Sequence, residues 1–202
     1  MVVKDNALIN ASYTLTLAEQ RMILLAIVEA REKGMTIDTR TPLAIHAEAY
    51  ANQFNVTKDA AYKVLAEAAT QLKAREFSFH EQRAVGIANI TSRWDQQVAY
   101  LENTATVGIL FTDALVPLIT ELERHFTSYE LEQVSGLTSG YAVRLYEMII
   151  AWRSVGKTPV FELAQFRWQL GGQLDECKRM DNFKAKILDC AIAQINEHRD
   201  IT

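Results

Sequence analysis

One segment near the start of this chain is repeated near its end. Residues 41–54 read TPLAIHAEAYANQF, and residues 158–170 read TPVFELAQFRWQL. Each copy follows an apolar helical pattern that closes in Arg-x-x-Gly, and each precedes another helical pattern. A repeated supersecondary unit of this size indicates two similar small domains. The order of helix, short strand, short helix, turn and longer helix is that of a winged helix-turn-helix. The predicted fold class is therefore α+β, with two winged-helix domains in tandem.

Length and composition are compatible with two cytoplasmic domains. The chain has 202 residues, 49% of them hydrophobic, which is enough for two domains of about 100 residues. No apolar run approaches the roughly 18 residues of a membrane span, and the opening MVVKDNALIN has no signal-peptide core. Cys177 and Cys190 lack the spacing of a metal site, which favours reduced thiols and a cytoplasmic location.

The first domain is predicted to span residues 1–130. Residues 1–15 read as a polar lead-in, and Thr16 and Glu19 form a capping box that starts a helix ending at Gly34. Thr57 is expected to cap the longer helix. The other expected elements are extended residues 35–45, helices 46–54 and 58–75, strands 76–83, 87–100 and 106–111, and an amphipathic helix 115–126. The three strands form a meander, which would be the wing.

The second domain is predicted to span residues 131–202, and a linker over 127–138 crosses the boundary between the two domains. Its expected elements are helix 141–155, strand 158–162, helix 163–170 and a helix 182–197 capped by Asp181. In the first unit, more than 30 residues with a strand pattern follow the longer helix. In the second unit, only residues 199–202 follow it, and they look like the start of a strand. The repeat therefore predicts a second domain that is incomplete, without its wing.

The helix over 182–197 is the better candidate for recognising DNA. Its apolar stripe comprises Phe183, Ile187, Leu188, Ala191, Ile192 and Ile195. Asn182 and Lys186 lie on the opposite face, and Lys178 and Arg179 come just before the helix. Asn pairs bidentately with adenine and Arg with guanine, whereas Lys184 would have to reach round the helix end. Ordinary solvated polar residues on an amphipathic helix explain the same pattern equally well.

The longer helix of the first unit is less suited to a DNA groove. Its outer face carries Asp59 and Glu67, which would repel phosphates. The cations that can still reach the DNA backbone are Lys58, Lys63, Arg75 and, at the hairpin tip, Arg83. A solvated face of mixed charge is the favoured interpretation of this helix. The net charge of −4 also counts against DNA binding, but the whole acidic excess lies in residues 1–130.

Enzyme activity finds no support in the sequence, and no catalytic residue, cofactor or metal ligand is predicted. The four histidines are scattered without ligand spacing, and none of the eight glycines belongs to a phosphate-binding loop. Trp94, Trp152 and Trp168 are expected to be core anchors rather than platforms for stacked bases.

Two long motifs resemble the plasmid replication initiator (Rep) proteins of the tandem winged-helix family. The stretch VVKDNALINASYTLTLAEQRMILLAI resembles the opening of that family. SGYAVRLYEMIIAWRSVGKTPVFELAQFRWQLG and then MDNFKAKILDCAIAQINEHRDIT resemble the start of its second domain. The resemblance covers essentially the whole chain in order, except that the chain ends before the second wing.

The resemblance implies an initiator that binds repeated sites, called iterons, in double-stranded plasmid origin DNA. It also implies a homodimer through the first domain that represses its own gene, and contacts with a host replication initiator and helicase. The main base contacts carry over to residues 182–193 with Lys178 and Arg179, and the first domain contacts the backbone. Two other hypotheses remain open: a truncated fragment that mainly dimerises, and a transcription regulator, for which the sequence offers no sensor domain.

Overall fold

The computed structural model describes residues 1–120, 125–171, 177 and 179–198, without the side chains of Glu102 and His198. Its helices are α1 (Asn6–Ile9), α2 (Leu17–Glu32), α3 (Ala47–Phe54), α4 (Lys58–Leu72), α5 (Val116–Thr120), α6 (Glu132–Ser135), α7 (Gly140–Ile150), α8 (Leu163–Gly171), α9 (Met180–Phe183) and α10 (Asp189–His198), with the turns η1 (Glu102–Thr104) and η3 (Lys184–Leu188). Its strands are β1 (Val2–Asp5), β2 (Ser12–Tyr13), β3 (Leu43–His46), β4 (Glu76–Arg83), β5 (Gly86–Arg93), β6 (Asp95–Leu101), β7 (Thr106–Phe111) and β8 (Phe126–Tyr129).

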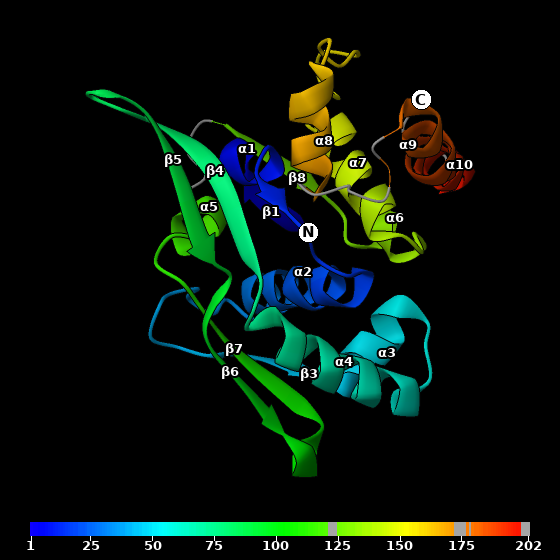
Figure 1. Ribbon diagram of the computed structural model, residues 1–202. Coiled ribbons are helices and arrows are strands. Elements are labelled where there is room, and N and C mark those ends of the chain that lie inside the picture. The colour runs from blue at the N-terminus through cyan, green and yellow to red at the C-terminus, as the bar shows by residue number, and fades with distance from the viewer. Residues whose placement is uncertain (121–124, 172–176, 178, 199–202) are drawn as a thin grey trace.

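Helix α2 runs through the middle of the molecule, with α3, α4 and the sheet β3–β7–β6 on one side and α6, α7 and α8 on the other (Figure 1). The predicted capping box is confirmed: Glu19 N–H donates to Thr16 Oγ1 at 3.2 Å, and Thr16 N–H donates to Glu19 Oε2 at 2.6 Å. All residues from Met22 to Val28 are buried. Since an amphipathic surface helix would bury one face alone, this run shows that elements on both sides cover α2.

The helix-turn-helix of the first unit forms as predicted. Tyr50 and Phe54 of α3 are buried with their rings in contact, at a centroid distance of 4.7 Å. Asn55 then takes the left-handed conformation at φ 51°, and Thr57 Oγ1 accepts from Ala60 N–H at the start of α4. The residues of the turn therefore predicted this helix-turn-helix correctly.

The predicted three-stranded meander is wrong, because the chain changes sheets in the middle of the expected strand 87–100. Trp94 and Asp95 are both buried, which breaks the alternation of a single strand. β5 ends before Trp94 and pairs with β4, whereas β6 begins after it and pairs with β7. The result is two sheets, β2–β4–β5 and β3–β7–β6, and the wing consists of β6 and β7. The β4–β5 hairpin projects separately from the body (Figure 1).

Trp94 marks this change of sheet and is a core anchor, as predicted. Its ring meets Tyr13 edge-on at 4.8 Å between centroids and packs against Phe77 at 4.9 Å. The same prediction is wrong for Trp152, which is 37% exposed because α7 ends at Ile150, before the predicted end at residue 155. Trp168 is partly buried and packs against His80 at 5.3 Å.

Residues 1–15 are structured and not a polar lead-in. β1 pairs with β8 from Val2 opposite Tyr129 to Asp5 opposite Phe126, and β2 pairs with β4. Val2 and Leu8 are fully buried. The partner strands are distant in sequence, and local patterns therefore gave no sign of this pairing.

The same long-range pairing changes residues 115–138. A helix is expected over residues 115–126, and the structure has the short helix α5 there. Residues 121–124 lie outside the described part of the chain, and Phe126 begins strand β8 instead of ending a helix. The expected linker contains the end of β8 and then α6. The predicted domain boundary at 130/131 falls between these two elements.

The second unit repeats the helices of the first but not its short strand. Leu43 of β3 is 3% exposed because β3 pairs with β7. Val160, its counterpart in the repeat, is 101% exposed, and none of the described strands pairs with residues 158–162. The strand prediction is therefore wrong for the described structure. The expected strand start at 199–202 lies outside the described residues.

Gly140 brings the N-terminus of α7 close to α2. A Cβ at this position would lie 2.8 Å from Gln20 Nε2 and 3.2 Å from the Leu15 carbonyl oxygen. We expect Gly140→Ala to lower the free energy of unfolding by about 1–3 kcal/mol in urea titrations, because a packed junction must shift. Gly108→Ala is the matched control, since its Cβ would meet nothing closer than 3.9 Å. Equal losses for the two variants would show that this close approach is unimportant.

Candidate nucleic-acid interface

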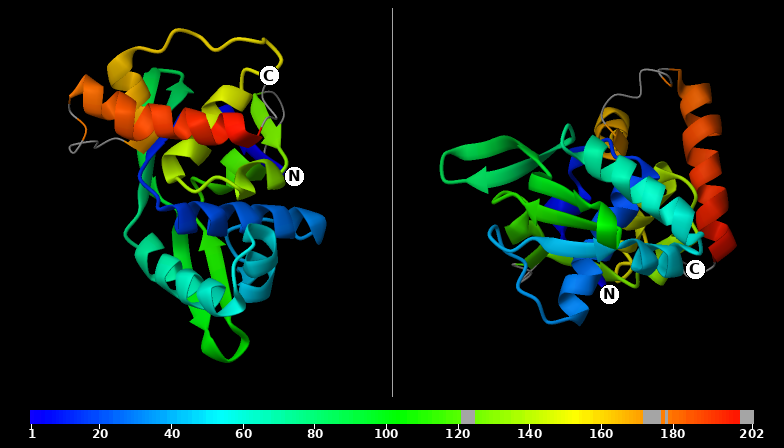
Figure 2. Two further views of the ribbon diagram at one scale, coloured as in Figure 1. Left: turned by 90° about the vertical axis from the view of Figure 1, so that its right-hand side faces the viewer. Right: turned by 90° about the horizontal axis from the view of Figure 1, so that it is seen from below.

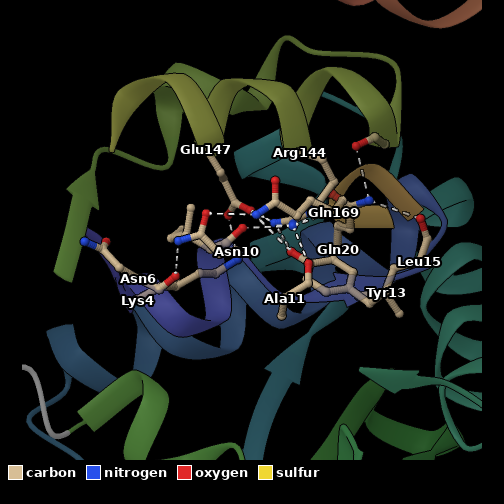
Figure 3. Close-up of polar contacts among 12 residues, drawn as sticks. Lys4, Asn6, Asn10, Ala11, Tyr13, Leu15, Gln20, Arg144, Glu147 and Gln169 are labelled. Carbon is tan, nitrogen blue, oxygen red and sulfur yellow. Dashed lines mark hydrogen bonds and ion pairs between the residues drawn. The ribbon is translucent and has the colours of Figure 1, made fainter. Parts of the chain in front are cut away.

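A buried polar cluster fixes α7, the helix that carries the candidate DNA-binding helix. Lys4 of β1 approaches Glu147 Oε1 at 2.5 Å (Figure 3). Tyr129 Oη donates to the same oxygen at 2.6 Å. Arg144 Nη1 donates to Glu147 Oε2 at 3.0 Å and to Tyr13 Oη at 2.8 Å. Arg144 Nη2 also donates to three backbone carbonyls, those of Ile9, Ala11 and Gln169. The N-terminal segment is thereby joined to α7 and α8.

In this cluster one carboxylate, that of Glu147, is paired with two cations, Lys4 and Arg144. Burial alone would raise the pKa of Glu147, but Lys4 and Arg144 outweigh it and hold the pKa below its ordinary value of 4.5. Burial raises the pKa of the Tyr129 hydroxyl, so this group stays protonated and donates to Glu147. Burial likewise raises the pKa of Tyr13. Glu147 is therefore ionised at neutral pH and is the centre of the cluster.

The long helix of the second unit consists of α9, η3 and α10, and it lies on the outside of α6 and α7 (Figure 2). Phe183 is fully buried, with the Arg167 guanidinium 4.5 Å from its ring centroid and the Phe166 ring edge-on at 6.2 Å. Near the other end, Thr138 N–H donates to Gln194 Oε1 at 2.9 Å. The helix is thus attached at both ends.

The predicted apolar stripe of this helix is largely confirmed, and it is wrong at Ile192, which follows the π-helical turn η3. The buried apolar residues fall four apart, at Phe183, Ile187, Ala191 and Ile195. Ile192, predicted to face inward, is 44% exposed. A π-turn adds about one residue to a helical turn, so the face that follows is rotated relative to an uninterrupted α-helix.

The helix also begins earlier than predicted. Arg179 is the N-cap residue of α9, and Asp181, the expected cap, lies within the first turn and accepts from Asn182 N–H at 2.9 Å. Asn182 is half-buried at the start of the helix, and Lys186 is exposed. Lys178 lies outside the described residues.

Most of the predicted contact cations are paired with carboxylates. Arg179 makes a bidentate contact with Asp181, at 3.1 Å from Nε and 2.7 Å from Nη2. This pairing holds the pKa of Asp181 below its ordinary value. Lys184 Nζ lies 2.9 Å from both carboxylate oxygens of Asp189. Lys186 has no ion-pair partner within the described residues.

The cations of the first unit show the same pattern. Lys58 Nζ lies 2.5 Å from Glu48 Oε1, and Arg83 Nε lies 2.6 Å from Glu81 Oε2 at the hairpin tip. Arg75 bonds the buried Glu19 at 2.8 Å, which gives this arginine a structural role at the start of α2. Lys63 is exposed on α4 and has no ion-pair partner in the described part of the chain.

Sequence reasoning missed the buried cluster, although one signal was present. Arg144 and Glu147 stand one helical turn apart in the apolar run YAVRLYEMII, where isolated charges must find partners. Nothing local indicated Lys4 as that partner. Among the described residues no group of three His, Cys, Asp or Glu side chains is placed to hold a metal ion, and none of the described helices could cross a bilayer.

Comparisons with known proteins agree with this architecture. The family described as "Initiator Replication protein, WH1" matches residues 1–150, and "Initiator Rep protein, WH2" matches residues 162–202. A "Replication initiation protein" of Escherichia coli is 24% identical over 92% of this chain, which spans 60% of that relative's length. The WH1 domain of MSBI1.176, a replication protein isolated from a multiple sclerosis patient, is 57% identical over 63% of this chain and 97% of that domain, with a TM-score of 0.51.

A second solved structure extends the likeness to both units. The Pi initiator protein, solved in complex with iteron DNA, matches 98% of this chain and 86% of its own, with a TM-score of 0.67 and 20% identity. At this identity the likeness shows a shared fold of tandem winged-helix domains. Together with the two family matches, it shows that the chain belongs to the initiator replication proteins, the plasmid replication initiators of the tandem winged-helix type.

Proposed function

We propose that this chain binds double-stranded DNA repeats in a plasmid origin through the long helix of its second unit and thereby takes part in initiating replication. The observation that carries the proposal is the outer face of that helix. Its apolar side is buried through Phe183 and Ile187, while Lys186, Arg179 and Lys184 stand exposed on the outside of the molecule. A helix anchored in this way can enter a major groove with its first turns against the bases.

The relatives support this proposal. The chain belongs to an initiator family, and the Pi initiator, which shares its fold, is described in complex with iteron DNA. The proposal includes binding to iterons and recruitment of a host replication initiator and helicase. It also includes action in the cytoplasm, by binding rather than catalysis. Lys63, Lys58 and Arg83 would add contacts to the phosphate backbone from the first unit.

A second function, dimerisation, is favoured by the β4–β5 hairpin. In the order β2–β4–β5 one side of β5 has no partner strand among the described residues. Val85 in the turn before β5 and Ile87 near its start are exposed. An open edge of this kind can pair with the same edge of a second copy across a two-fold axis. Autorepression by such a dimer would use the same DNA-binding face.

The test of DNA binding is a fluorescence titration of the chain against duplexes taken from the DNA that flanks its gene. We expect tandem repeats of roughly two helical turns there, and Lys186→Ala to weaken binding to them by about 1–3 kcal/mol if Lys186 contacts a base. Lys157→Ala, which removes the same charge from an exposed loop, is the control. If Lys186→Ala and Arg179→Ala both leave the titration unchanged, the assigned helix is wrong.

Light scattering on the same samples tests the second function. A dimer that binds none of the flanking duplexes would make the chain a dimerisation module and contradict the DNA-binding proposal. A species that binds the duplexes, whether monomer or dimer, would support it.

A further inference from the structure

Two acidic residues on the proposed recognition helix neutralise two of its cations. Asp181 and Arg179 are exposed and share a bidentate contact, with Asp181 Oδ2 2.7 Å from Arg179 Nη2. Asp189 and Lys184 are likewise exposed, with both carboxylate oxygens 2.9 Å from Nζ. The second pair spans the π-helical turn, which sets residues five apart side by side. Neither carboxylate is needed to satisfy a buried group.

The carboxylates weaken the attraction of this helix for phosphates. A carboxylate that lies within 3 Å of a cation cancels much of its charge at the distance of an approaching phosphate. Binding to DNA of any sequence depends on such phosphate contacts. The pairs themselves are exposed and therefore contribute little to folding, although Asp181 also accepts from Asn182 N–H in the first turn of the helix.

Each pair presents a donor and an acceptor side by side. The major-groove edge of a G·C pair carries the complementary arrangement, with acceptors at guanine O6 and N7 and a donor at cytosine N4. The cation can therefore donate to guanine while the carboxylate accepts from cytosine. A phosphate offers acceptors alone and satisfies only half of the pair.

We propose that Asp181 and Asp189 are specificity-determining residues, which suppress binding to phosphates and, with Arg179 and Lys184, read G·C pairs in the DNA site. This inference rests on the proposed function, because it assumes that the helix enters the major groove. It also explains how a chain with a net charge of −4 can act on DNA. Arg179 and Lys184 bind the DNA at full strength only where the base sequence supplies a donor for the neighbouring carboxylate.

The first experiment measures binding to a mixed-sequence duplex across a salt series from roughly 50 to 200 mM. We expect Asp181→Ala and Asp189→Ala each to tighten this binding about three- to tenfold at low salt, since each removes a negative charge that faces the phosphates. The salt dependence should steepen by up to about one counterion per variant. Glu197→Ala removes an equal charge from α10, where Glu197 contacts no cation in the described structure, and should change little. An equal effect of Glu197→Ala would overturn the proposal in favour of net charge alone.

The second experiment uses a duplex that the wild-type chain selects from a randomised library, with each G·C pair changed in turn to A·T. At least one change should weaken wild-type binding about tenfold, and this loss should disappear in the Asp181→Ala or Asp189→Ala variant. Asp181→Asn keeps an acceptor oxygen and should retain part of the discrimination while it still tightens binding to the mixed-sequence duplex. If every G·C change weakens the wild type and the Ala variants equally, the carboxylates do not read bases and the proposal fails.

The two proposals fail in different ways. If the wild-type chain selects no sequence from the library, the function proposed above fails and this inference fails with it. If the wild type selects a sequence and the Asp variants discriminate as well as it does, DNA recognition stands and only the role of Asp181 and Asp189 is overturned.

Discussion

Glu147→Ala is expected to lower the free energy of unfolding by about 3–5 kcal/mol, as measured by urea titration. The substitution leaves Lys4 and Arg144 buried without their shared carboxylate, and the hydroxyls of Tyr13 and Tyr129 lose an acceptor. Uncompensated buried charge is much more costly than the loss of a surface pair. The effect should also separate the N-terminal strand β1 from α7.

Two further variants show whether burial is the cause. Glu130→Ala removes a carboxylate that pairs with the N-terminal ammonium at the surface, at 3.4 Å, and should cost about 0–1 kcal/mol. Lys4→Met should cost less than Glu147→Ala, because Arg144 still neutralises the carboxylate. A loss for Glu147→Ala as small as that for Glu130→Ala would contradict the assigned cluster.

The same cluster predicts a pH dependence. Because the folded pKa of Glu147 lies below its ordinary value of 4.5, its ionised form stabilises the fold above that pH, and the contribution is lost as the pH falls below it. Glu147→Gln carries no titrating group at this position. The difference in stability between the wild type and Glu147→Gln should therefore narrow as the pH falls below 4.5. A difference that stays constant down to the folded pKa would show that the carboxylate is not the source.

Local signals in the sequence predicted the helix-turn-helix of the first unit. The capping box at Thr16 and the cap at Thr57 each depend on residues close in sequence, and both formed as expected. The repeat likewise indicated the second set of helices, α7, α8 and the long helix. These features are encoded within one or two helical turns, which is why the sequence alone sufficed.

Features that depend on distant partners were missed. The pairing of β1 with β8 joins segments more than 100 residues apart, and so does the contact between Lys4 and Glu147. The change of sheet at Trp94 depends on which strands β5 and β6 meet, not on their own pattern. The pairing of Lys184 with Asp189 also had no local signal, because the two residues meet across a turn that the sequence suggested would be α-helical.

Phe183→Ala is expected to detach the long helix from α7 and abolish DNA binding. Phe183 is fully buried between Phe166 and Arg167, and removal of a buried phenylalanine side chain costs about 3–5 kcal/mol. The first unit should remain folded, since the ring contacts of Phe183 are with Phe166 and Arg167 of α8, in the second unit. Circular dichroism during thermal unfolding should then show an early transition that involves part of the helical signal.

Ile192→Ala is the control that makes this result specific to the observed phase of the helix. The sequence pattern places Ile192 in the buried stripe, where its truncation would cost about 2–5 kcal/mol. With the π-turn over Lys184–Leu188, Ile192 is 44% exposed, and truncation should cost only a small part of that. Comparable losses for Phe183→Ala and Ile192→Ala would place Ile192 in the core and contradict the observed packing of the helix.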